Sequence, residues 1–111
     1  MPASKIPLLT LSILATATIA EEQAVGHDGA VASAAGKMLG LAISEAPSGT
    51  QVGVDTLGTG VAIAGAAIAN GADLQVGSSG KLVTQTAGII VARALQAAAA
   101  DGDKLEVLLT P

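Results

Sequence analysis

Residues 66–83 read A-A-I-A-N-G-A-D-L-Q-V-G-S-S-G-K-L-V, and residues 101–109 read D-G-D-K-L-E-V-L-L. A further apolar run lies between them, from Gly88 to Leu95. Each apolar run has the length of a strand, and Gly, Asn, Asp and Ser separate the runs, which is typical of short β-strands joined by tight turns. The second half of the chain is therefore predicted to be almost entirely β-structure.

A weaker copy of this pattern of short apolar runs and turn residues occurs upstream. It predicts that residues 19–54 and residues 68–107 are two copies of one β unit. Glycines recur at the predicted turns of both copies, where a positive φ favours glycine over other residues. In particular, we expect left-handed backbone geometry at Gly80 and Gly102. The corresponding pairs are Ile19 and Ile68, Ala20 and Ala69, Val25 and Val76, Gly26 and Gly77, Gly29 and Gly80, Gly36 and Gly88, Ala42 and Ala94, Ala46 and Ala98, Gly49 and Gly102, and Val54 and Val107.

The remaining elements are expected to be short strands and turns. Two segments are ambiguous, because alanine is a good helix former whereas Val-Ala-Ile alternation favours a strand. We expect a short helical turn or bend at residues 66–70, and a strand followed by a loop at residues 92–100. Together the elements predict an all-β fold, either a small β-sandwich or a barrel-like domain. The other predicted strands are residues 30–33, 38–43, 51–54 and 61–64, and the predicted turns are residues 26–29, 47–49, 58–60 and 101–103.

The composition limits how this domain can be stabilised. A chain of 111 residues is long enough for one domain, and half of its residues are hydrophobic, but it contains no Phe, Tyr or Trp. Aromatic side chains bury about 150–250 Å² each, so Ala, Val, Leu and Ile must supply all of the core packing here. Because small side chains give little contact area, we expect much of the stability to come from association with other chains.

The distribution of charge argues against nucleic-acid binding. The net charge is −4, and the basic residues are scattered along the chain. Neutralising phosphates requires clustered cations, and stacking on bases requires aromatic rings. The chain also lacks cysteine, which excludes a disulfide framework and a Cys-based metal site. The basic residues are Lys5, Lys37, Lys81, Arg93 and Lys104.

The first twenty residues fit two descriptions. Lys5 precedes an uncharged run, residues 6–20, whose small residues before Glu21 resemble the end of a secretory signal peptide. Partial alternation of β-forming residues instead favours an extended arm, residues 1–20, in front of a single β domain, residues 21–111. The run is too short and too rich in Thr and Ser to predict a membrane span.

An uncharged strand that stays exposed is an aggregation hazard, so we expect the arm to pair with a neighbouring strand or to lie on another protein. Its apolar residues are therefore the candidate contacts with a partner or a second subunit. These candidates are Ile6, Leu8, Leu9, Leu11 and Ile13.

The chain offers little that could support catalysis. His27 beside Asp28 is the only candidate for general acid–base work, and a solvated G-H-D-G turn explains both residues. Residues 58–65 contain glycines but lack the spacing of a dinucleotide fingerprint. Residues 101–106 contain three acidic residues but lack the spacing of an EF-hand loop. We therefore predict that the protein is not an enzyme, with no catalytic residue, cofactor site or metal site.

The run from residue 67 to residue 109 closely resembles the C-terminal half of the capsid decoration proteins of tailed bacteriophages, also called cement proteins. The shared order is small apolar residues, a Gly-Asp turn, a strand, Gly-Lys-Leu, two more strands, an Ala-rich loop, Gly-Asp and a final strand. The chain supplies it with Gly71 and Asp73, residues 80–82, and residues 101–109. The resemblance begins near Gly36, and the N-terminal arm has no counterpart in it.

This resemblance implies a compact β protein that binds the outer surface of an icosahedral head and bridges neighbouring subunits of the major capsid protein. It further implies self-association as a homotrimer, with a dimer as the alternative, and a place on the virion after assembly in the host cytoplasm. Contact with nucleic acid or a membrane is not expected. A description from another class stays open, namely an exported bacterial β-rich surface or periplasmic binding module whose signal peptide is cleaved after residues 15–20.

Overall fold

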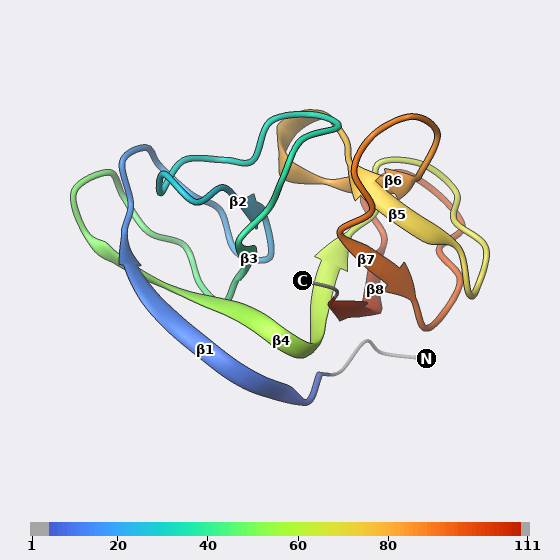
Figure 1. Cartoon of the computed structure of the whole chain (residues 1–111), viewed down its shortest axis with the longest axis horizontal. Coiled ribbons are helices and arrows are strands. Elements are labelled where there is room, and N and C mark those ends of the chain that lie inside the picture. Colours follow the sequence, from blue (N-terminus) through green and yellow to red (C-terminus); the bar gives the residue numbers. More distant parts are fainter. Residues whose placement is uncertain (1–4, 110–111) are drawn as a thin grey trace.

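One long strand, β4 (Gln51–Ile63), pairs with strands from both halves of the chain (Figure 1). The computed structural model describes residues 5–109. All paired strands are antiparallel, in the order β2-β3-β4-β8-β7-β5-β6, with β1 on β4 beside this path. The elements are β1 (Pro7–Leu14), β2 (Ala24–Val25), β3 (Gly40–Ala42), β4, β5 (Asp73–Val76), the 3-10 turn η1 (Ser78–Gly80), β6 (Leu82–Thr84), β7 (Ala92–Ala94) and β8 (Lys104–Leu109).

The sheet curls into a nearly closed barrel. Just beyond the end of β4, Ala64 forms a parallel bridge with Leu82 of β6, and the Gly65 N–H donates to the Leu82 carbonyl over 2.9 Å. These contacts join the two ends of the path from β4 through β8, β7 and β5 to β6. The all-β prediction is confirmed, in its barrel-like form. No helix within residues 5–109 has the length and apolar character needed to cross a membrane.

β4 serves both halves because it bends at glycine without ending. Its first part pairs with β1 and β3, and its last residues, from Thr59 to Ile63, pair with β8. Gly58 adopts a φ of +90° inside the strand, next to an irregular register in β1. The ladder nevertheless continues, because the Thr59 N–H donates to the Ile6 carbonyl over 3.1 Å. The predicted turn at residues 58–60 is therefore wrong: Gly58 bends a strand that continues through these residues.

The other turns and short strands mostly follow the prediction. Gly80 and Gly102 have φ values of +71° and +93°, so their predicted left-handed geometry is confirmed. Residues 92–94 form β7 and a loop follows, as expected. Residues 66–70 form a bend without a helix. The predicted strand at residues 30–33 is wrong, because its pairing is limited to a single bridge between Val25 and Val31.

The core is built from Ala, Val, Leu and Ile, and it divides into two clusters. The larger cluster lies mainly among the strands of the second half and includes Leu74, Leu82 and Leu105, all fully buried. The smaller cluster lies under the first half and centres on Ile19 and Val54. Each cluster thus consists of small and medium-sized aliphatic side chains.

The two halves repeat the same backbone hydrogen bonds. Ile19 and Ala46 exchange two N–H to carbonyl bonds of 2.8 and 2.9 Å, and Ile68 and Ala98 exchange two of 2.9 Å. The pairing of β1 with the first part of β4 likewise matches the pairing of the last part of β4 with β8. We propose that the halves arose by duplication of one unit, with β4 shared between the copies. In this comparison β1 corresponds to the last part of β4.

An ion pair attaches the start of β1 to β4. The Lys5 ammonium lies 2.7 Å from Asp55 Oδ2, and the Thr10 hydroxyl donates to Asp55 Oδ1 over 2.8 Å. The Asp55 side chain is 3% exposed, whereas that of Lys5 is 35% exposed. A carboxylate this deeply buried is costly unless it is paired, so Lys5 stabilises both Asp55 and the β1–β4 edge.

Replacing Gly80 and Gly102 individually with alanine should distinguish the stability lost to backbone strain from the stability lost to a steric clash. Both positions need a left-handed conformation that costs alanine about 1 kcal/mol. A Cβ at Gly80 would lie 2.4 Å from Gln23 Cγ and 3.2 Å from the Ala24 nitrogen, whereas a Cβ at Gly102 would have no neighbour within 4 Å. Gly80→Ala should therefore lose about 2–3 kcal/mol in urea unfolding, and Gly102→Ala about 1 kcal/mol. Equal losses would contradict the packing described around Gly80.

Removal of Lys5 should destabilise the fold more than removal of an equally exposed lysine. Lys5→Ala leaves Asp55 buried beside Thr10 alone, which should cost about 1–3 kcal/mol in chemical unfolding. Lys81 is the matched control: its side chain is 34% exposed, and its partner Asp101 is 63% exposed. Lys81→Ala should change stability by less than about 0.5 kcal/mol. A Lys5→Ala variant as stable as the control would show that the buried ion pair contributes nothing.

Candidate functional site

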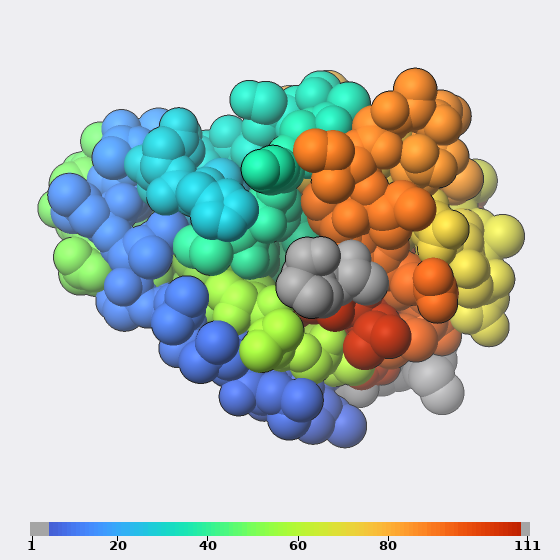
Figure 2. Space-filling model, in the orientation of Figure 1, coloured from blue at the N-terminus to red at the C-terminus, as the bar shows by residue number. Residues whose placement is uncertain are grey.

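β1 presents apolar side chains to solvent along nearly its whole length. Leu8 is 77% exposed, and the preceding Ile6 is 70% exposed. Figure 2 shows the strand as a continuous ridge, drawn in blue, along one edge of the molecule. Within residues 5–109 only β4 pairs with β1, so the outer edge of the ridge also keeps unpaired backbone groups. Such an edge can accept another strand.

The structure places the expected contact residues at different depths. Ile6 and Leu8 project furthest, while Leu9 and Leu11 are 42% and 38% exposed. Ile13 is half-buried and packs against the smaller core cluster, so it anchors β1 more than it offers surface. Leu14, which is 52% exposed, was absent from the expected set. It lies within the same uncharged run, residues 6–20, so the sequence did carry a signal for it.

A hollow of about 500 Å³ adjoins this ridge. It lies where β1 and β4 face the loop that leads into β7, and most of its lining is apolar. Sequence reasoning missed Leu57, Ile89 and Ile90, which are 40–46% exposed, because the fold brings them together from distant segments. The residues that line the hollow are Leu11, His27, Lys37, Met38, Leu39, Thr56, Leu57, Ile89, Ile90 and Val91.

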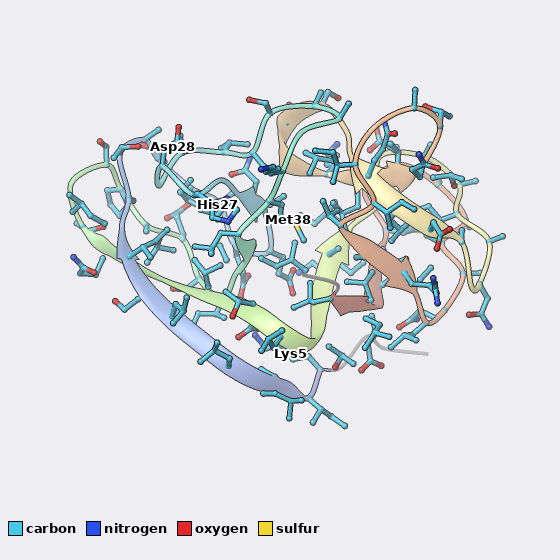
Figure 3. The ribbon with its side chains drawn as sticks, viewed as in Figure 1. Lys5, His27, Asp28 and Met38 are labelled. Carbon is cyan, nitrogen blue, oxygen red and sulfur yellow. The ribbon has the colours of Figure 1, made fainter. Side chains whose placement is uncertain are left out.

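His27 and Asp28 are not arranged as an acid–base pair. His27 extends toward Met38 in the hollow, whereas Asp28 points away at the outer end of the turn (Figure 3). Asp28 Oδ1 accepts a hydrogen bond of 3.1 Å from the Ala30 N–H, which serves to close the turn. The predicted turn at residues 26–29 is confirmed, with Gly29 at a φ of +86°.

The acidic residues near the C-terminus also serve a turn. Asp103 Oδ2 accepts hydrogen bonds of 3.0 and 3.1 Å from the N–H groups of Ala99 and Ala100, and Asp101 pairs with Lys81. This agrees with the predicted turn at residues 101–103. Among the described residues, no three His, Cys, Asp or Glu side chains are grouped so that they could hold a metal ion.

Ion pairs occupy most of the basic residues. The structure pairs Lys5 with Asp55, Lys81 with Asp101, Arg93 with Asp73, and Lys104 with Glu22. The hydrogen bond and the charge of Glu22 raise the pKa of Lys104 above its usual value. Lys37 forms no ion pair within residues 5–109 and lies exposed at the hollow. The surface of residues 5–109 thus combines an apolar ridge, an apolar hollow and an exposed lysine without an ion pair, a combination that suits binding.

Comparison with known proteins identifies the family. The family model for phage cement protein matches residues 4–109. Among solved structures, the crystal structure of the head fiber gp8.5 N base in bacteriophage phi29 resembles this chain with a TM-score of 0.76 and 20% identity, over 92% of this chain and 93% of that one. At this identity the likeness establishes a shared fold. No curated protein matches the sequence. Because the family model spans nearly the whole described chain, this protein belongs to the phage cement protein family.

Proposed function

We propose that the protein binds the outer surface of a phage head and stabilises it by bridging neighbouring subunits of the major capsid protein. Its family gives it a structural role in the phage capsid. The observation that carries the finer proposal is the ridge of β1, where Ile6 and Leu8 are exposed on a strand with a free edge. The family assignment favours this role over that of an exported binding module.

The energetics of the ridge suit a protein interface. Full burial of a leucine or isoleucine side chain contributes about 1.5–3 kcal/mol, and β1 exposes several of them side by side. Contiguous exposed apolar surface of this kind marks an interaction site in soluble proteins. The open edge of β1 adds backbone donors and acceptors that a partner strand could pair with. The proposed contacts are therefore Ile6, Leu8, Leu9 and Leu11. Ile13 instead packs against the smaller core cluster and anchors the strand.

Self-association would strengthen this attachment. The core contains only aliphatic side chains, so contact with further copies would add burial that the single chain lacks. A homotrimer, or alternatively a dimer, would join several modest capsid contacts into one multivalent attachment. A location outside the shell also suits a protein of net charge −4, because the packaged genome is itself negatively charged. Nothing in this role requires catalysis.

A single substitution on the ridge tests the proposal. Leu8→Asp places a charge where an apolar contact is expected, and it leaves the core unchanged because Leu8 is 77% exposed. Binding to heads that lack the protein, followed by co-sedimentation, should weaken at least tenfold, as expected from the loss of one buried leucine. The thermal stability that the protein confers on those heads should fall in parallel.

The control is Leu95→Asp, which changes an exposed leucine outside β1 and should leave binding unchanged. Deletion of the whole strand is a poorer test, because it would also uncover β4 and the smaller core cluster. Unchanged head binding by Leu8→Asp, at wild-type stability, would contradict the role of the ridge.

A further inference from the structure

The hollow beside β1 has apolar walls from separate parts of the chain. Leu11 and Leu57 come from β1 and β4, and Ile89 and Ile90 come from the loop before β7. Backbone hydrogen bonds hold the surrounding segments: the Ile89 N–H donates to the Ala35 carbonyl over 3.2 Å. The walls are thus set by the fold itself, so a ligand would not have to order them on binding.

Leu39 and Val91 hold matching places on the two sides of the hollow. The Leu39 N–H donates to the Val25 carbonyl over 2.7 Å, and the Val91 N–H donates to the Leu74 carbonyl over 2.9 Å. Leu39 directly precedes β3, and Val91 directly precedes β7. The hollow therefore lies between the two halves, where neither half provides a side chain to fill it.

The basic side chains at the hollow form no ion pair within residues 5–109. Lys37 and His27 are its basic lining residues, and no carboxylate lines it. Asp28 lines a second hollow that His27 and Lys37 also border, but it forms no ion pair with either of them, and Asp55 pairs with Lys5. The third polar lining residue, Thr56, donates its hydroxyl to the Leu9 carbonyl over 3.1 Å. Within residues 5–109 the arginine and each of the other lysines have an acidic partner, so Lys37 stands out among them in a protein of net charge −4.

We propose that this hollow receives an extended segment of the capsid protein that carries apolar side chains and a carboxylate. Its volume, about 500 Å³, suits a few side chains and is too small for a folded domain. The apolar walls would bury the aliphatic part, and Lys37 would pair with the acidic group and fix the direction of the segment. This inference rests on the proposed capsid binding and specifies the chemistry of the segment that the hollow would bind.

Two substitutions test the hollow against matched controls, with heads of the same phage that lack the protein as the probe. Ile90→Asp should weaken head binding at least tenfold, whereas Leu95→Asp, with the same 42% exposure outside the hollow, should bind as the wild type does. Lys37→Gln should weaken binding several-fold and flatten its dependence on salt concentration, because a lost charge pair lowers that dependence. Lys81→Gln should have neither effect.

The outcomes separate this inference from the proposed function. If the wild-type protein binds heads and the Ile90→Asp and Lys37→Gln variants bind equally well, the hollow is not the docking site, while the capsid role stands. If the wild-type protein does not bind heads, the proposed function itself fails. If Lys37→Gln changes the oligomeric state in native mass spectrometry and leaves head binding intact, a second copy occupies the hollow, and the inference is overturned.

Discussion

The antiparallel pairing of β4 is the interaction on which the rest of the structure depends. This one strand forms backbone hydrogen bonds with β1 and β3 from the first half and with β8 from the second half. The strands of both halves therefore depend on the same pairing partner. Without it, β1, β3 and β8 would lose a common pairing partner. The strand can serve both halves because Gly58 turns its direction locally while Thr59 keeps the ladder paired. A side chain at Gly58 would collide with the Ile6 carbonyl, 2.5 Å from where its Cβ would stand.

The lack of aromatic residues shapes what surrounds this strand. Aliphatic side chains form the two core clusters, but the space between the halves stays open as the hollow near Leu57. In a core with larger side chains, an aromatic ring could fill this space. Here it remains accessible, next to the exposed ridge of β1. The absence of large side chains thus limits the core and also leaves an accessible apolar surface for a partner.

Much of the fold could be predicted from local sequence signals, and the errors have a common cause. Gly80 and Gly102 follow from turn chemistry, because a positive φ is a local requirement that glycine meets. Gly58 meets the same requirement inside a strand, and only the pairing partners reveal that the chain does not reverse there. The ridge was predictable because the absence of charge in residues 6–20 is visible in the sequence. The hollow was not, because Leu57 and Ile90 meet only through tertiary packing.

The shared strand also determines how the molecule would respond to mechanical force. β1 lies along the first part of β4, and β8 lies along its last part (Figure 1). Tension applied between β1 and β8 along the strand axis must therefore travel through β4, with both ladders loaded in shear. In that geometry the hydrogen bonds of a ladder share the load together and do not open one after another. A molecule held at β1 and at β8 would thus resist extension in the direction in which its sheet is hardest to separate.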